Sequence, residues 1–202
     1  HRFKTHGGLF ERFLRIMYNI NVRLCACLLG TLWVFAGYAH GSVNGVEIMK
    51  QFEFDSIDGG KINLGEFAGN PILVTNTASN CGFTRQYNDL QKLHDDFSDD
   101  GLVVLAVPSE DFFQEFSENR KVKEFCEVNF SLTIPMTTIT SVKGRKAHPL
   151  YKWLASEHNF RPAWNFNKIL FNGAGDFVGS FGAFTNPDSK KIRAKIKELL
   201  QK

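Results

Sequence analysis

Residues 72–84 read ILVTNTASNCGFT, an apolar run followed by small and polar residues, after which an amphipathic pattern begins. A continuous apolar run is typical of a buried strand, and the residues after it of a strand-to-helix connection. Cys81 lies in that connection, and the N-terminus of a helix favours a thiolate. A free cysteine is more often a small buried residue, and the pattern alone favours that interpretation.

The residues after Cys81 predict a strand–helix–strand unit. Tyr87, Leu90, Leu93 and Phe97 fall on one stripe of residues 86–97, which predicts an amphipathic helix. Residues 102–107 read LVVLAV, a pattern typical of a buried parallel strand that ends at Pro108.

The flanking segments complete one α/β domain. Two short runs, 52–54 and 62–64, enclose glycines and predict an N-terminal β-hairpin. Further helices are expected at 120–130 and at 149–157, and Pro187 is expected to open a terminal helix. Strands are expected at 168–171 and 177–181 around the turn signal NGAG. This order predicts a thioredoxin-like fold, in which helices flank a central mixed sheet.

We expect residues 1–41 to be a targeting segment and residues 42–202 to be the folded domain. An uncharged apolar run at 24–39 precedes small residues that include Ala39 and Gly41, which is the layout of a secretory signal. Residues 1–16, which precede the first methionine, Met17, are candidates for non-native sequence. Export to a periplasm or to the outside is therefore expected. An uncleaved membrane anchor and an organelle transit peptide are the alternatives.

Charge and cysteine content change when the expected targeting segment is set aside. It holds five of the 24 basic residues and one of the 21 acidic residues, so the remaining domain is close to neutral. A near-neutral domain does not indicate nucleic-acid binding. Cys25 and Cys27 also belong to the segment, which leaves Cys81 and Cys126 in the domain.

No cofactor or metal site is indicated by the domain sequence. Its histidines, which include His94 and His148, do not combine with the two cysteines in a zinc-ligand spacing. They are better interpreted as surface or core residues.

Several ordered motifs together indicate a family. The chain from about residue 52 to residue 202 resembles the glutathione peroxidases, in their cysteine-containing branch. The strongest matches are NTASNCGFT at 76–84 and WNFNK at 164–168. Supporting matches are LAVP at 105–108, KEFC at 123–126 and PLYKWL at 149–154.

The resemblance implies that Cys81 is the peroxidatic cysteine. Its thiolate would attack a hydroperoxide and become a sulfenic acid, with water or an alcohol released. Trp164 and Asn165 match the family's hydrogen-bond donors at this site. Taken alone, Trp164 is better interpreted as a core aromatic residue and Asn165 as a turn residue.

The loop after Pro108 departs from the family pattern. It reads SEDFFQE, one residue shorter than in relatives, and Asp111 stands at the position of the family's catalytic glutamine. An ionised carboxylate beside Cys81 would raise the pKa of the thiol. Three alternatives follow: Asp111 points away, Asp111 is protonated or paired, or Gln114 supplies the donor.

Cys126 matches the resolving cysteine of thioredoxin-dependent relatives. The resemblance implies that it condenses with the Cys81 sulfenic acid to a disulfide, which would require local unwinding of the helix at 120–130. The alternative is a buried helix cysteine that faces the core. The expected reductant is a thioredoxin-like dithiol protein or glutathione.

Two further expectations concern assembly and rival functions. The short segment between Trp153 and Trp164 lacks the insertion that relatives use for tetramer contacts, so we expect a monomer. The altered Asp111 loop favours a rival interpretation, a non-enzymatic redox sensor or binding module of thioredoxin fold. A thiol–disulfide exchanger is a second rival, but it normally carries a Cys-x-x-Cys pair, and Thr84 stands at the second position.

Overall fold

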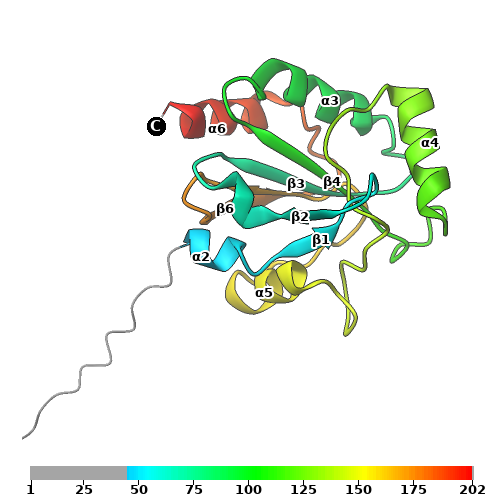
Figure 1. Cartoon of the computed structure of the whole chain (residues 1–202). Helices are drawn as coiled ribbons and strands as arrows, with labels where there is room; N and C mark the ends of the chain where they lie inside the picture. The colour runs from blue at the N-terminus through cyan, green and yellow to red at the C-terminus, as the bar shows by residue number, and fades with distance from the viewer. Residues whose placement is uncertain (1–44, 202) are drawn as a thin grey trace, which may run out of the picture. The chain divides into compact units, whose positions relative to one another are not determined.

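The computed structural model describes residues 45–201 (Figure 1). The expected targeting segment, and its boundary at residues 41 and 42, lie outside these residues. None of the described helices is long and apolar enough to cross a membrane.

A four-stranded mixed sheet forms the centre of the fold, with strand order β4-β3-β5-β6. β3 (Ile72–Thr77) is parallel to β4 (Val103–Pro108) and antiparallel to β5 (Lys168–Phe171). β5 in turn pairs antiparallel with β6 (Phe177–Phe181). The predicted mixed sheet is therefore confirmed, and Pro108 is the last residue of β4.

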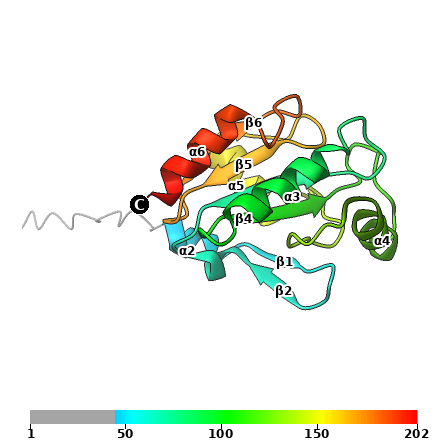
Figure 2. The same ribbon diagram turned by 90° about the horizontal axis from the view of Figure 1, so that it is seen from above.

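Helices cover both faces of this sheet. α3 (Gln86–Phe97) and α6 (Lys190–Leu200) lie on one face, and α5 (Pro149–Glu157) lies on the other (Figures 1 and 2). α4 (Asn119–Phe130) stands at one end of the molecule. α6 begins three residues after Pro187, where the Ser189 side chain caps it by accepting a hydrogen bond from the N–H of Ile192.

The N-terminal part of the domain joins the face that carries α5. After α2 (Gly45–Met49), the hairpin of β1 (Glu53–Asp55) and β2 (Lys61–Asn63) forms a separate two-stranded sheet. A 3₁₀ turn, η1 (Leu64–Phe67), then leads to β3. The predicted hairpin is confirmed, displaced by one residue on each strand.

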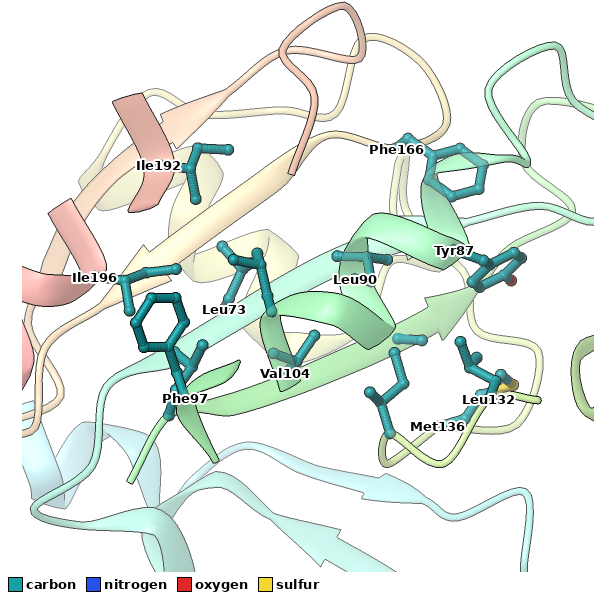
Figure 3. Close-up of a cluster of buried hydrophobic side chains, with 14 of the residues drawn as sticks. Leu73, Tyr87, Leu90, Phe97, Val104, Leu132, Met136, Phe166, Ile192 and Ile196 are labelled. Atoms are coloured by element: carbon teal, nitrogen blue, oxygen red, sulfur yellow. The ribbon is translucent and has the colours of Figure 1, made fainter. Parts of the chain in front are cut away.

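Side chains of the central strands point alternately to the two faces of the sheet, and they form two separate core clusters. Leu73, Val104 and Leu170 pack with α3 and α6 in the cluster that Figure 3 shows, whereas their neighbours Val74 and Leu105 pack toward α5 and the hairpin. Because successive side chains of a strand point to opposite faces, a continuous apolar run supplies both clusters. The loops that carry the expected site residues follow the carboxyl ends of β3 and β4, or precede β5.

Candidate active site

Cys81 lies in a tight turn between β3 and α3. Its N–H donates to the Thr84 hydroxyl oxygen at 3.0 Å, and the Thr84 N–H donates to the Cys81 carbonyl oxygen at 3.1 Å. The Thr84 hydroxyl also lies 2.9 Å from the carbonyl oxygen of Ala78. α3 begins only at Gln86, so Cys81 lies five residues before the helix and not at its N-terminus. The turns between them are closed by the Thr84 hydroxyl and by i→i+3 backbone hydrogen bonds from Thr84 and Gln86.

The turn supplies the hydrogen bond that a helix N-terminus would have offered to the sulfur. Cys81 is half-buried and free, and its Sγ accepts a hydrogen bond from the Phe83 N–H at 3.4 Å. An N–H donor favours the thiolate over the neutral thiol. The local backbone therefore provides part of what a reactive cysteine needs.

Gln114 and Asn165 meet beside this turn. The Asn165 side-chain amide donates to the Gln114 side-chain oxygen at 3.0 Å, and the Gln114 carbonyl oxygen accepts from the Asn80 N–H at 2.8 Å. Asn165 is fully buried, and its side-chain oxygen has no partner within the described structure. The loops that follow β4 and precede β5 are thus joined to the residue next to Cys81.

Trp164 is held by its backbone and leaves its ring partly open to solvent. Its carbonyl oxygen accepts from the side-chain amides of Asn76, at 2.9 Å, and Asn167, at 2.6 Å. Its ring packs on that of Phe112, with centroids 5.4 Å apart, and the residue is 42% exposed. This exposure argues against the core-aromatic interpretation of Trp164.

Asp111 is directed away from the Gln114–Asn165 pair. Its carboxylate accepts hydrogen bonds from the N–H groups of Val142, at 2.6 Å, and Lys143, at 2.9 Å, and from the Ser141 hydroxyl. Of the three alternatives, the structure therefore supports an Asp111 that points away and is paired, with Gln114 as the polar side chain next to Asn165.

Cys126 lies in the core, on the buried side of α4. It is 1% exposed and free, and it packs in the same cluster as Tyr87 and Val122. Burial raises the pKa of the Cys126 thiol to about 12, and the nearby Glu115 carboxylate acts in the same direction. In this conformation Cys126 is a neutral thiol.

Glu115 was not singled out by the sequence reasoning. Its Oε1 accepts from the N–H groups of Ser79, at 3.1 Å, and Phe116, at 2.8 Å, which ties the loop after β4 to the end of β3. Burial raises the pKa of this carboxyl group. In the sequence, the only indication of a role for Glu115 is that it directly follows Gln114.

Exposed aromatic rings beside the site were also missed. Phe113 and Phe184 are 95% and 91% exposed, and the Phe184 ring meets the Phe83 ring edge-on, with centroids 5.1 Å apart. Phe113 precedes Gln114 and has a positive φ of 59°, which is unusual for a bulky side chain. The paired phenylalanines at 112–113 were the available signal.

His148 has a structural position at the start of α5. His148 caps α5, where its Nδ1 accepts from the Leu150 N–H, and its ring stacks on Phe54 at 3.7 Å between centroids. Within residues 45–201, no group of three or more His, Cys, Asp or Glu side chains is arranged to hold a metal ion.

Comparisons with known proteins agree with these observations. The family model described as glutathione peroxidase matches residues 49–155. The chain is 38% identical to the glutathione peroxidase homolog BsaA of Bacillus subtilis, over 72% of this chain and 94% of that protein. It is also 38% identical to the hydroperoxy fatty acid reductase gpx1 of Synechocystis, over 74% of this chain and 94% of that protein.

Solved structures give the same result for the fold. The crystal structure of Trgpx in its apo form matches with a TM-score of 0.60 at 30% identity, and covers 76% of this chain and 96% of that one. A thiol:disulfide interchange protein of the thioredoxin family from Chlorobium tepidum matches with a TM-score of 0.56 at 15% identity, over 74% and 92% of the two chains. The predicted thioredoxin-like fold is thereby confirmed.

Proposed function

The chain belongs to the glutathione peroxidase family and is a peroxidase that reduces hydroperoxides, and from this premise we propose that Cys81 is the sulfur that reacts. Its thiolate attacks the terminal oxygen of the hydroperoxide and forms an S–O bond as the O–O bond breaks. The leaving alkoxide or hydroxide takes up a proton and departs as alcohol or water, and Cys81 is left as a sulfenic acid.

One observation carries this assignment: the Gln114–Asn165 pair lies next to the turn that holds Cys81. Side-chain amides can donate to the sulfur or to the peroxide oxygens as charge moves between them. We assign this function to Gln114, Asn165 and the Trp164 indole, and not to Asp111. The altered Asp111 loop is the feature that favours the redox-sensor alternative. In that loop Gln114 accepts from Asn165, and Asp111 is bonded to residues 141–143, which weakens this support.

We further propose that Cys126 resolves the sulfenic acid. The Cys126 sulfur forms a bond to the Cys81 sulfur, the Cys81 S–O bond breaks, and the hydroxide leaves as water with the proton of Cys126. The buried position of Cys126 means that α4 must unwind locally first. Support comes from the helix itself, in which only Val122 and Cys126 are fully buried, while Phe125 and Phe130 are partly buried against the same cluster.

The reductant and the setting are proposals as well. A disulfide between Cys81 and Cys126 is best reduced by a thioredoxin-like dithiol protein, and a persistent sulfenic acid by glutathione. The segment between Trp153 and Trp164 supports a monomer. Export rests on the sequence of residues 1–41 alone.

Peroxide consumption tests the assignment of Cys81. Wild-type protein with thioredoxin and thioredoxin reductase should consume hydroperoxide, and Cys81→Ser should abolish this turnover. Cys126→Ser should still react once with peroxide but should lose thioredoxin-driven turnover. Undiminished turnover in Cys81→Ser would refute the assignment.

Mass spectrometry tests the role of Cys126. One equivalent of peroxide should yield a Cys81–Cys126 disulfide in the wild type and a sulfenic acid on Cys81 in Cys126→Ser. A lasting sulfenic acid beside a reduced Cys126 in the wild type would indicate a one-cysteine cycle instead.

A further inference from the structure

A buried lysine, Lys168, lies in the strand that follows the Trp164–Asn165 turn. It is the first residue of β5, is 0% exposed, and pairs in the sheet with Thr75 on one side and Phe181 on the other. Among the residues that the structure describes, no carboxylate lies within ion-pair distance of its Nζ. The mechanism above assigns no role to this lysine.

The Lys168 ammonium group is instead surrounded by neutral oxygen atoms. Its Nζ donates to the Gln86 side-chain oxygen, to the Thr185 carbonyl oxygen at 2.6 Å and to the Ala183 carbonyl oxygen at 3.5 Å. An ammonium group has three donors, so these three acceptors satisfy it. Burying a charged group without an opposite charge is costly, and an apolar side chain would fill the same space at lower cost. The arrangement therefore indicates a role that depends on the hydrogen bonds.

These bonds join two segments that are far apart in the sequence. The Gln86 side chain also donates to the Ala183 carbonyl oxygen at 2.7 Å, so Lys168 and Gln86 hold the loop of residues 183–185 together. Gln86 is the first residue of α3, and its N–H donates to the Phe83 carbonyl oxygen at 2.9 Å. Lys168 thus anchors the 183–185 loop against the start of α3.

The anchored loop reaches the cysteine through two aromatic rings. Phe184, in the centre of the loop, packs edge-on against Phe83, and the Phe83 N–H is the donor to the Cys81 sulfur. A movement of the loop would release one side of the Phe83 ring and free the turn to move. The N–H to sulfur bond depends on this turn.

We propose that Lys168 is a positioning residue for Cys81. Lys168 holds the 183–185 loop in place, and Phe184 of this loop holds the Phe83 ring. The position of Phe83 in turn maintains the hydrogen bond from its N–H to the Cys81 sulfur. The proposal deepens the function assigned above, since it rests on Cys81 as the reacting sulfur. A purely structural role of Lys168 would affect the stability of the whole domain, whereas this proposal predicts a specific effect on the reactivity of the Cys81 thiol.

The test is the pH dependence of Cys81 alkylation by iodoacetamide, followed by mass spectrometry of the Cys81 peptide. We expect Lys168→Met to slow the alkylation of Cys81 near neutral pH by about tenfold, the usual effect of losing one hydrogen bond to a charged group. Ile169→Val is the matched control, because it loosens the same strand on the opposite face of the sheet. Its Cys81 profile should equal that of the wild type.

Phe184→Ala provides a second variant that should fold, because this side chain is almost fully exposed. It should shift the Cys81 profile in the same direction, and the double variant Lys168→Met/Phe184→Ala should shift it no further than Lys168→Met alone. An unchanged profile in Phe184→Ala, or effects of the two substitutions that add, would overturn the proposal. Alkylation does not require peroxidase activity, so a protein without peroxide turnover would refute the proposed mechanism and leave this test intact.

Discussion

The side-chain amide of Asn165 donates a hydrogen bond to the side-chain oxygen of Gln114 at 3.0 Å, across 51 positions of sequence. Gln114 lies in the loop before α4, and Asn165 lies in the loop after α5. The Gln114 carbonyl oxygen also accepts a hydrogen bond from Asn80, the neighbour of Cys81. A buried amide needs such a partner, because an unsatisfied donor in the interior is costly. The contact therefore fixes the orientation of both side chains beside the turn that holds Cys81.

Removal of the Gln114 side chain should impair both stability and catalysis. We expect Gln114→Ala to lower the free energy of unfolding by about 1–3 kcal/mol, because the Asn165 amide is left buried without an acceptor. We also expect kcat/KM for hydroperoxide to fall by roughly one to two orders of magnitude, as for the loss of a donor at a reacting centre. Urea unfolding and steady-state peroxide consumption measure the two effects.

Gln114→Glu serves as the control for that substitution. It keeps an acceptor for Asn165, so stability should be close to that of the wild type. Its carboxylate should slow the alkylation of Cys81 near neutral pH, because a negative charge close to the sulfur disfavours the thiolate. Full activity in Gln114→Ala would show that the pair is only a structural contact.

Substitution of Asp111 should affect stability and leave the thiol unchanged. Its carboxylate accepts from two backbone N–H groups and one hydroxyl of residues 141–143. Asp111→Asn keeps one acceptor oxygen and should cost about 1–2 kcal/mol of unfolding free energy, and Asp111→Gln, whose side chain is longer, should cost at least as much. The rate of peroxide reduction by the folded protein should change less than twofold. A large gain of activity in either variant would mean that Asp111 does act on Cys81.

The sequence predicted the elements well and the directions of loop side chains poorly. Strands and helices repeat a pattern over several residues, so the stripe of Leu90 and Leu93 and the run at Leu105 were sufficient to predict α3 and β4. The direction of Asp111 depends instead on the turn at Phe113, whose φ is positive, and on hydrogen-bond donors of residues 141–143, which lie about thirty positions away. No local pattern contains that information.

The burial of Lys168 was equally hidden from the sequence. A lysine at the start of a strand usually lies at the surface, and two of the three partners of Lys168 are backbone carbonyl groups, which every residue possesses. Cys126 differs in that its place on the apolar side of a helix could be read from its spacing to Val122 and Phe130.

The exposed aromatic rings predict a preference among hydroperoxides. Phe113 and Phe184 present apolar surface beside the site, and burying part of a ring against an organic substrate is favourable. We expect Phe113→Ser to lower kcat/KM for an apolar organic hydroperoxide by about three- to tenfold and to leave that for hydrogen peroxide nearly unchanged. Val128→Ser, at an exposed apolar residue of α4, is the control. Equal losses for both peroxides in Phe113→Ser would contradict this role.

The requirement for unwinding of α4 predicts an effect of a residue outside the site. Ser131, the C-cap of α4, has a left-handed backbone with φ 48°, and its N–H donates to the carbonyl oxygens of Cys126 and Glu127. Glycine adopts this conformation without strain, so Ser131→Gly should stabilise the end of the helix by about 1 kcal/mol. Formation of the Cys81–Cys126 disulfide should then slow by about fivefold, because local unwinding of α4 requires about 1 kcal/mol more free energy.

Quenched mass spectrometry after one equivalent of peroxide would measure this rate. Asn159→Gly is the matched control, since Asn159 also has a left-handed backbone but lies beyond α5. It should leave the rate of disulfide formation unchanged. A rate in Ser131→Gly equal to that of the wild type would show that resolution does not require this end of α4 to open.

Lys168 should make the stability of the protein depend on pH above neutrality. Burial lowers the pKa of its ammonium group from 10.5 to about 7, with Asp89 opposing this shift. Between pH 7 and 10.5 the unfolded chain therefore holds a proton that the folded protein has released, so the free energy of unfolding rises with pH in this window. Below pH 7 both states are protonated, and the contribution of Lys168 no longer varies.

The difference between the wild type and Lys168→Met isolates this contribution in urea unfolding between pH 6 and pH 9. Cys126 acts with the opposite sign, since its pKa rises from 9.0 to about 12 on folding and the stability due to its neutral thiol is lost as pH rises through that range. The wild type and Lys168→Met both retain Cys126, so the effect of Cys126 cancels in the difference between their free energies of unfolding. We expect the stability of the wild type relative to Lys168→Met to be constant from pH 6 to about 7 and to increase from there to pH 9. A difference that does not change with pH would mean that Lys168 keeps its proton in the folded protein.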